Sequence, residues 1–246
     1  SSVSGLAMFA PAFGGGLYDW DRAQLTLNTP ENLRALSFLA GTRARLGFDT
    51  VTRFESGHSR DVANVAWPFI TGAYGIMIDG QWRVEQIAQH APDLAYETFP
   101  IPPPAGGHAH AGWASGNFAM IAKGAKHVEG AWEFITFWSG IHDPDRAAEF
   151  YTWGGWLPPF PDIAEAPAYR EYVEKNPQFQ AFLDVLPSKY LQPMPPVSHQ
   201  AYLWDRIQAA YEAAMRGTLS PEAAIARIAL DNDREVAMRK ELGYTE

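Results

Sequence analysis

Segments with the pattern of β-strands alternate with segments patterned as helices along the middle of this chain. Short apolar or alternating runs at 74–78, 94–101 and 118–122 are typical of strands, while apolar residues recur at helical spacing in 82–90 and 128–138. This alternation predicts an α/β fold, with helices packed on a sheet. The length of 246 residues is near the upper limit for a single core, so it is compatible with one lobe or two.

Helices are also predicted on either side of this middle region. The run Asn28-Thr29-Pro30-Glu31 supplies a cap, an early proline and an early acidic residue, which predicts a helix over 30–46. Two further helices are predicted at about 197–216 and 221–242, where Ser-Pro-Glu opens the second. The segment 48–60 shows no clear periodicity, and we expect it to be irregular. A short strand is expected at 24–27 and strand-like pairing near Gly112-Trp113.

Composition excludes several classes of protein. The formal charge is −9, from 28 acidic against 19 basic residues, and no Lys/Arg cluster forms the footprint that a phosphate backbone requires, so nucleic acid is not an expected partner. No apolar run is long enough to span a bilayer, so contact with a membrane is expected to be peripheral at most. Cysteine is absent, which removes disulfides, thiolate metal sites and cysteine nucleophiles together. The opening residues show no signal peptide.

Catalytic and metal-binding motifs are missing as well. The sequence has no nucleophile elbow, zinc-protease helix, P-loop or dinucleotide fingerprint. His108 and His110 flank one alanine in a glycine-rich loop, but no Cys or acidic ligand stands nearby, so a solvated loop is the better interpretation. Asp143-Pro144-Asp145 is typical of a helix start, with carboxylates at the positive end of the helix dipole. We therefore predict no catalytic residue, no metal and no cofactor, and a protein that is not an enzyme.

The tryptophans give the first indication of function. Aromatic residues make up 13% of the chain, with nine Trp. Trp132 and Trp138 belong to the apolar helix at 128–138, which predicts a core or interface position for them. The others of interest occupy element ends, glycine-flanked segments or a proline-rich bend, namely Trp82, Trp113, Trp153, Trp156 and Trp204. Flat aromatic faces pack on the C–H faces of a pyranose ring, so although packing explains each ring singly, the set favours a sugar-binding cleft.

Three stretches of sequence occur in a distinctive order. The first runs from Phe69 to Trp82: a small-residue turn, an apolar strand with a Met, and then Gly-x-Trp. The second joins the strand that ends at Pro102 to a glycine-rich return strand and a helix containing Ala-Trp-Glu-Phe at 131–134. The third is Gly-Gly-Trp-Leu-Pro at 154–158, followed by the bend at 194–196 and the helix that holds Trp204. In this order the stretches resemble the extracellular solute-binding proteins of ABC importers, in particular the sugar-binding branch that includes maltose-binding protein.

The resemblance implies a fold and a domain organisation. It implies the type II periplasmic-binding-protein fold, an α/β architecture of two lobes joined by hinge crossings, which we place near 100–112 and 151–160. Members of the family are usually much longer, so the amino-terminal part of the usual fold is expected to be missing here. Residues 1–100 are then expected to form part of the C-terminal lobe. Residues 101–155 are expected to hold the hinge strand and part of the N-terminal lobe, and residues 156–246 to return to the C-terminal lobe with the terminal helices.

The resemblance also implies a function and a location. It implies extracytoplasmic capture of a sugar-like solute, in the periplasm or lipid-anchored at the cell surface, for delivery to the membrane permease of an ABC transporter. Glu55 and Asp205 are further candidates for accepting hydroxyl hydrogen bonds. The expected ligand-binding residues are Trp82, Trp204, Trp113, Trp156, Tyr151 and Asp79.

Two other functions remain open from the sequence. A carbohydrate-active enzyme would also use aromatic rings, but it requires a pair of carboxylates flanking the scissile bond. A truncated chain could instead act as an interaction module that binds no solute. Ligand-induced stabilisation and the absence of cleavage products distinguish these alternatives from a binding protein.

Overall fold

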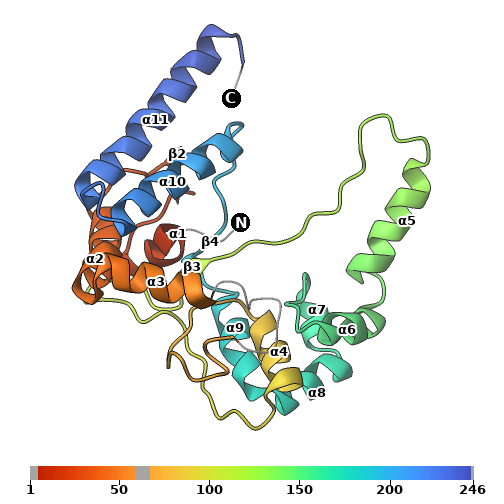
Figure 1. The fold of residues 1–246 in the computed structure, drawn as a ribbon. Helices are drawn as coiled ribbons and strands as arrows, with labels where there is room; N and C mark the ends of the chain where they lie inside the picture. The colour runs from red at the N-terminus through yellow and green to blue at the C-terminus, as the bar shows by residue number, and fades with distance from the viewer. Residues whose placement is uncertain (1–4, 59–66, 245–246) are drawn as a thin grey trace. The chain divides into compact units, whose positions relative to one another are not determined.

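The computed structural model describes residues 5–58 and 67–244, shown as a ribbon in Figure 1. The chain divides into two compact units, and it passes from one unit to the other after residues 59, 99, 115 and 186. Unit 1 is Ser1–Ser59, Pro100–Ser115 and Pro187–Glu246, and unit 2 is Arg60–Phe99 and Gly116–Leu186. The assignment of 1–100, 101–155 and 156–246 to the lobes of a larger protein stays a prediction.

Unit 1 is built mainly from helices. They are α1 (Gly5–Phe9), the 3₁₀ turn η1 (Pro11–Phe13), α2 (Pro30–Leu46), α3 (Phe48–His58), α10 (Gln200–Met215) and α11 (Pro221–Glu241). The helix predicted at 30–46 is confirmed as α2, and the Thr29 hydroxyl accepts the Asn32 N–H as its cap. The two predicted C-terminal helices are confirmed as α10 and α11, with Ser220 capping α11.

The expectation of an irregular segment at 48–60 is wrong, because α3 occupies most of it. A tertiary ion pair ties this helix to α2. The guanidinium of Arg43 on α2 donates to both carboxylate oxygens of Glu55, at 2.8 and 2.7 Å, and its NH2 also donates to the Thr52 hydroxyl at 3.2 Å. Contacts that lie far apart along the chain override a weak local propensity here.

The core of unit 1 lies where α2, α10 and α11 meet. Leu36, Leu203, Ile207, Ile225 and Ile228 are almost completely buried. The helices α10 and α11 lie side by side in Figure 1. Gly217, with φ of +72°, makes the turn between them, and the Phe48 ring lies so close that a Cβ on this glycine would touch it.

Strands in the described residues are short, and all of them belong to unit 1. An antiparallel pair joins β1 (Tyr18–Asp19) to β2 (Gln24–Leu25), and β3 (Gly112–Trp113) pairs in parallel with β4 (Leu191–Gln192). The strand expected at 24–27 is thus seen in its first half, and pairing at Gly112-Trp113 is confirmed.

Unit 2 is helical throughout its described regular elements. They are α4 (Trp82–His90), α5 (Val128–Ser139), α6 (Pro144–Trp153), α7 (Pro161–Ala164), α8 (Pro167–Lys175), the turn η3 (Pro177–Phe179) and α9 (Gln180–Val185). The helices predicted at 82–90 and 128–138 are confirmed, and the Asp143 carboxylate caps α6 as predicted. Val84, Ala147, Ile163, Tyr169 and Phe179 form the buried centre of this unit.

The predictions of strands at 74–78, 94–101 and 118–122 are wrong, since among the described residues none of these three segments is hydrogen-bonded to another strand. A strand requires a neighbour for its backbone N–H and C=O groups, and in the described part of the chain these segments have no such neighbour. Side chains fasten the second segment instead. The Thr98 hydroxyl donates to the Gln178 carbonyl, and the Gln178 carboxamide donates to the Tyr96 carbonyl at 3.4 Å.

None of the helices described has both the length and the apolar composition that crossing a bilayer would require.

One buried side chain fastens the loop that precedes α2. Asn32 is fully buried, and its carboxamide oxygen accepts the Gly16 N–H at 2.9 Å. Its nitrogen donates to the carbonyls of Gly16, Thr26 and Leu27 at 2.8, 2.7 and 3.1 Å. Both ends of the β1–β2 hairpin are therefore bound to the first turn of α2.

Asn32→Ala should lower the free energy of unfolding by at least about 2 kcal/mol, because it strands a buried N–H and several buried carbonyls. The measurement is urea denaturation followed by circular dichroism. Asn28→Ala, which changes an exposed Asn four residues earlier, is the matched control and should be nearly neutral. Equal stabilities for the two variants would contradict this role for Asn32.

Candidate functional site

Unit 1 brings two of the predicted indole rings together. Trp113 comes from β3 and Trp204 from α10, and their ring centroids are 5.2 Å apart with the planes tilted by 30°. Both rings pack against the core of unit 1 and remain partly exposed. The indole nitrogen of Trp113 is buried, so Trp113 offers aromatic ring rather than a free N–H at the surface.

Polar and aromatic groups of β4 and the residue before it lie beside this indole pair. Gln192 is the register partner of Trp113, and its carboxamide fills the space that a side chain at Gly16 would occupy. Tyr190 stacks on His108 with centroids 3.8 Å apart and planes 16° from parallel. The sequence analysis missed Gln192 and Tyr190, although they lie two and four residues before the start of the bend at 194–196 that it had singled out.

A metal site at His108 and His110 is not supported. The ring face of His108 is covered by Tyr190, and the described residues contain no group of three or more His, Asp or Glu side chains that could hold a metal ion.

Trp82 and Asp79 lie at the start of α4 in unit 2. Trp82 is 43% exposed, and its indole folds back over Gly80 so closely that a Cβ on this glycine would overlap the ring. The Asp79 carboxylate accepts the Gly80 N–H at 2.9 Å and the Arg83 Nε–H at 2.7 Å. Arg83 is itself held over the buried ring of Trp67, 4.1 Å from its centroid. Asp79 therefore has a fixed orientation.

Tyr74 lies in the same electrostatic environment. Burial raises the pKa of the Tyr74 phenol, Asp79 raises it further, and Arg83 opposes both effects. The phenol therefore stays protonated at neutral pH and remains able to donate a hydrogen bond.

Tyr151 and Trp156 belong to a second aromatic group of unit 2, at the end of α6. The ring of Phe150 lies 5.4 Å from Tyr151 and 5.2 Å from Trp156 between centroids. Trp156 is 42% exposed, while its backbone carbonyl accepts the buried Tyr169 hydroxyl at 2.9 Å. Burial raises the pKa of Tyr151, and Arg146 partly offsets the effect.

Trp82 and Trp156, two of the exposed indoles of unit 2, share one local geometry. In Gly80-Gln81-Trp82 and in Gly154-Gly155-Trp156, the ring folds over the glycine two residues before it, and a Cβ on either glycine would overlap the indole. In both segments the glycine is needed because it lets the indole approach the backbone closely. A left-handed backbone is not the reason, since neither Gly80 nor Gly154 has a positive φ. One face of each ring is thus covered by backbone.

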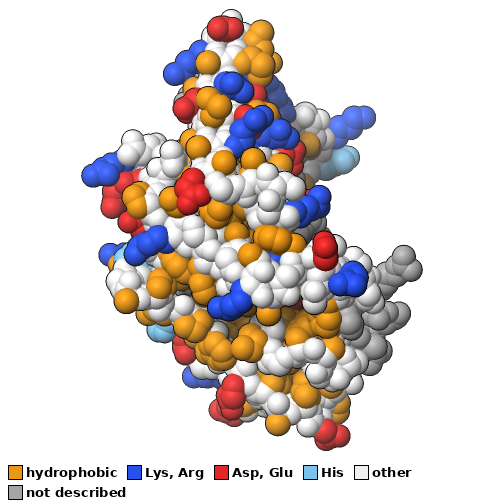
Figure 2. Space-filling view, turned by 60° about the vertical axis from the view of Figure 1, so that its left-hand side comes forward, with side chains coloured by type: hydrophobic (Ala, Val, Ile, Leu, Met, Phe, Trp, Pro, Cys, Tyr) orange, Lys and Arg blue, Asp and Glu red, His pale blue; other side chains and the backbone are white. Residues whose placement is uncertain are grey.

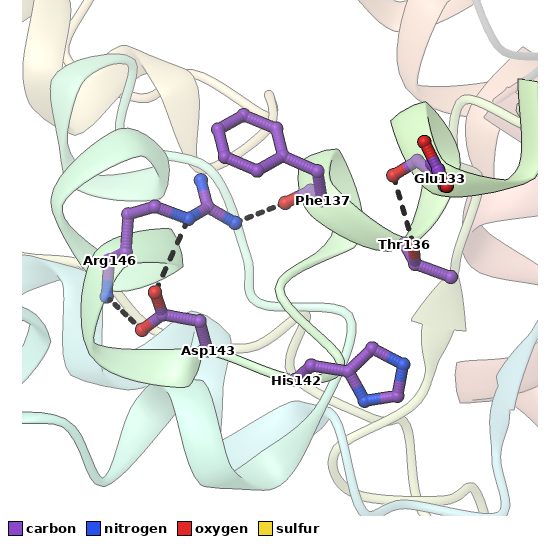
Figure 3. A pocket seen from close by; sticks show the side chains of 6 residues that line it. All are labelled: Glu133, Thr136, Phe137, His142, Asp143 and Arg146. Carbon is purple, nitrogen blue, oxygen red and sulfur yellow. Dashed lines mark hydrogen bonds and ion pairs between the residues drawn. The ribbon is translucent and has the colours of Figure 1, made fainter. Parts of the chain in front are cut away.

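A pocket of about 400 Å³ opens between the end of α5 and the start of α6, and Figure 3 shows its lining. Arg146 donates to the Phe137 carbonyl, lies over the Phe137 ring at 3.8 Å, and pairs with Asp143 at 3.6 Å. The Thr136 hydroxyl donates to the Glu133 carbonyl at 2.9 Å. The Arg146 guanidinium in this pocket is therefore already paired with Asp143. None of the six predicted ligand-binding residues lines the pocket.

The structure thus groups the predicted residues within units. Trp113 and Trp204 meet in unit 1, while Asp79 and Trp82 share the start of α4 and Tyr151 and Trp156 share the Phe150 group in unit 2. Glu55 is engaged by Arg43, whereas Asp205 is exposed on α10. That the groups contact one ligand stays a prediction.

Comparison of the sequence with protein families decides the assignment. Residues 4–181 match the family described as bacterial extracellular solute-binding protein. The chain belongs to this family. Its members are named for binding solutes outside the cell, which agrees with the resemblance found in the sequence. Among curated protein sequences, none matches the chain.

Solved structures show the same fold, the type II periplasmic-binding-protein fold. The chain superposes on CpMnBP1 with mannotriose bound at a TM-score of 0.75 and 24% identity, covering 92% of this chain and 56% of that one. The sugar-binding protein MalE from Xanthomonas citri superposes at a TM-score of 0.72 and 22% identity, covering 99% of this chain and 58% of that one. The maltose/maltodextrin-binding domain MalE from Bdellovibrio bacteriovorus bound to maltotriose superposes at a TM-score of 0.66 and 19% identity, covering 95% of this chain and 57% of that one. The chain spans less than two thirds of the length of each of these proteins.

Gly80→Ala should displace the Trp82 indole, because the new methyl group would occupy the position of the ring. The Trp82 indole N–H resonance, assigned by comparison with Trp82→Phe, should shift in an NMR spectrum. Gly75→Ala is the control, since a Cβ at Gly75 meets open space. A Trp82 resonance that is the same in both glycine variants would contradict the folded-back geometry.

Proposed function

We propose that this chain binds a sugar-like solute outside the cytoplasm and takes part in its delivery to the membrane permease of an ABC importer. The observation that carries the proposal is the set of indole rings that are fixed on one side and open on the other. Trp82 and Trp156 are each covered by a glycine backbone on one face and are about two fifths exposed. Trp113 and Trp204 instead pack against each other and against the core of unit 1, and both stay partly exposed.

Such rings suit a carbohydrate because a pyranose has apolar C–H faces and polar edges. A ring whose position is set by its surroundings loses little conformational entropy when a ligand stacks on it. Stacking contributes about 1 kcal/mol per ring beyond the burial of area, by analogy with aromatic pairs. The oriented Asp79 carboxylate supplies an acceptor for hydroxyl groups.

The ligand class is proposed from chemistry and from the comparisons together. CpMnBP1 has mannotriose bound and the Bdellovibrio bacteriovorus domain maltotriose. Several separate aromatic rings suit a ligand of more than one sugar unit, because each ring covers one pyranose face. We therefore propose a short oligosaccharide as the ligand.

Trp204→Ala and Trp82→Ala should each weaken binding of mannotriose or maltotriose by about tenfold or more, since a loss of about 1.4 kcal/mol corresponds to tenfold. Titration calorimetry measures the effect. Trp20→Ala in unit 1 is the matched control, because the Trp20 ring is 48% exposed and is not assigned to the site. A control variant that loses as much affinity as the site variants would refute the assignment.

Binding without catalysis is the second part of the proposal. Asp79 and Asp143 each pair with an arginine, whereas a glycosidase needs two carboxyl groups that face the scissile bond. Prolonged incubation with mannotriose or maltotriose, analysed by chromatography, should give no shorter sugar, while the same sample shows a ligand-induced rise in melting temperature. Sugar cleavage would favour the enzyme alternative, and an unchanged melting temperature would favour a non-binding module.

A further inference from the structure

Gln192 is a polar residue that the fold places beside the indole pair of unit 1. It is the register partner of Trp113 in the parallel pairing of β3 with β4, so the two side chains project from the same face, on strands about 5 Å apart. Backbone hydrogen bonds hold this register on both sides of Trp113. The Gly112 N–H donates to the Tyr190 carbonyl at 3.2 Å, and the Ala114 N–H donates to the Gln192 carbonyl at 3.0 Å.

The side chain of Gln192 lies directly on the backbone of Gly16. A Cβ at Gly16 would overlap both the oxygen and the nitrogen of the Gln192 carboxamide, so a larger residue at position 16 would displace it. Gly16 also has a φ of +143°, which favours glycine over other residues. The carboxamide is thus positioned by the absence of a side chain on its neighbour.

The Gln192 carboxamide has no hydrogen-bond partner among the described residues. Gly16 cannot serve as one, because its N–H donates to the Asn32 carboxamide oxygen at 2.9 Å, and its carbonyl already accepts from Asn32 at 2.8 Å and from the Thr26 hydroxyl at 3.0 Å. Gln192 is half-buried, and its carboxamide stays accessible, unlike the unpartnered indole nitrogen of Trp113. Its two N–H donors and its acceptor are therefore available to a ligand.

We propose that Gln192 determines which sugars the indole pair accepts, by hydrogen-bonding two neighbouring hydroxyl groups of the pyranose that stacks on Trp113 and Trp204. The inference rests on the proposed sugar binding and adds a residue that selects the ligand. The carboxamide oxygen accepts a hydrogen bond from one hydroxyl, and the nitrogen donates to the oxygen of the next. A carboxylate at this position could only accept, whereas a carboxamide does both.

The ligand that this arrangement selects is an uncharged sugar ring with two adjacent free hydroxyl groups. A carboxamide is neutral, and a ring that carried a carboxylate or phosphate at this position would call for Arg or Lys instead. The ammonium of the neighbouring Lys189 lies over the Tyr190 ring, 5.0 Å from its centroid. On the face seen in Figure 2, charged side chains of both signs lie among hydrophobic ones, whereas a surface that attracts an ionic solute carries one sign.

The test compares binding of a trisaccharide with binding of analogues that each lack one hydroxyl group. The trisaccharide is mannotriose or maltotriose, whichever the unmodified chain binds more tightly, and titration calorimetry on the intact chain measures each affinity. Gln192→Leu keeps a side chain of similar size without donor or acceptor, and it should bind the parent sugar about tenfold more weakly. Gln192→Glu, which loses the donor, should also bind it more weakly.

The pattern across the analogues separates recognition from a structural effect. On the unmodified chain, two analogues that lack adjacent hydroxyls should bind about tenfold more weakly than the parent sugar. On Gln192→Leu the same two should lose less than about threefold, because the partner of the missing hydroxyl is already absent. A change of structure alone would weaken the parent and every analogue by the same factor.

Two further measurements serve as controls. Gln24→Leu is the matched variant, because Gln24 is an exposed glutamine on β2 of the same unit, and it should bind every sugar as the unmodified chain does. In thermal unfolding, Gln192→Leu should melt at or above the temperature of the unmodified chain, because the carboxamide forms no hydrogen bond within the described residues.

Unchanged affinity in Gln192→Leu, or an equal loss for the parent sugar and every analogue, would overturn the inference and leave sugar binding in place. If the unmodified chain bound neither trisaccharide, the proposed function would fail and this inference with it. The two failures are therefore distinguishable in one set of titrations.

Discussion

The packing of α10 between α2 and α11 is the interaction on which unit 1 depends. Leu203, Ile207, Ala210 and Ala214 recur at helical spacing and are buried along one face of α10. Trp204 follows directly after the first of them, so the register that buries Leu203 also sets Trp204 at the edge of the core. From there its ring reaches Trp113, which β3 holds against the same core. A shift of α10 by one residue would either bury this indole or separate it from its partner.

Unit 2 positions its indoles by a different device. Trp82 and Trp156 are held by the backbone of the glycine two positions earlier, and neither ring belongs to the buried centre of the unit. This leaves each ring fixed on one face and accessible on the other, which is what stacking on a sugar requires. The same accessible arrangement thus arises from core packing in unit 1 and from the absence of a side chain in unit 2.

Local signals allowed most helices to be predicted from the sequence, because caps such as Thr29, Asp143 and Ser220 act within a few residues. Helix α3 was missed because its sequence has no clear periodicity, and its contact with α2 through Arg43 and Glu55 is tertiary. The strands expected at 74–78, 94–101 and 118–122 failed for a related reason, since a strand pattern gives no information on whether a partner strand is present. Candidate site residues could be proposed from composition and resemblance, and their contact with a ligand stays a prediction. The pairing of Trp113 with Trp204, and the positions of Gln192 and Tyr190 beside it, required the fold.

The central claim is that aromatic rings of this chain lie flat against a carbohydrate. Saturation-transfer difference NMR of the intact chain with mannotriose tests it most directly, because saturation of the protein through its aromatic protons passes most strongly to the sugar protons that lie closest to the protein, and the tryptophan variants identify the rings responsible. The account predicts strong transfer to the C–H protons of the pyranose faces, reduced in Trp82→Ala and Trp204→Ala. An absence of transfer from the aromatic protons, with mannotriose and equally with maltotriose, would contradict it.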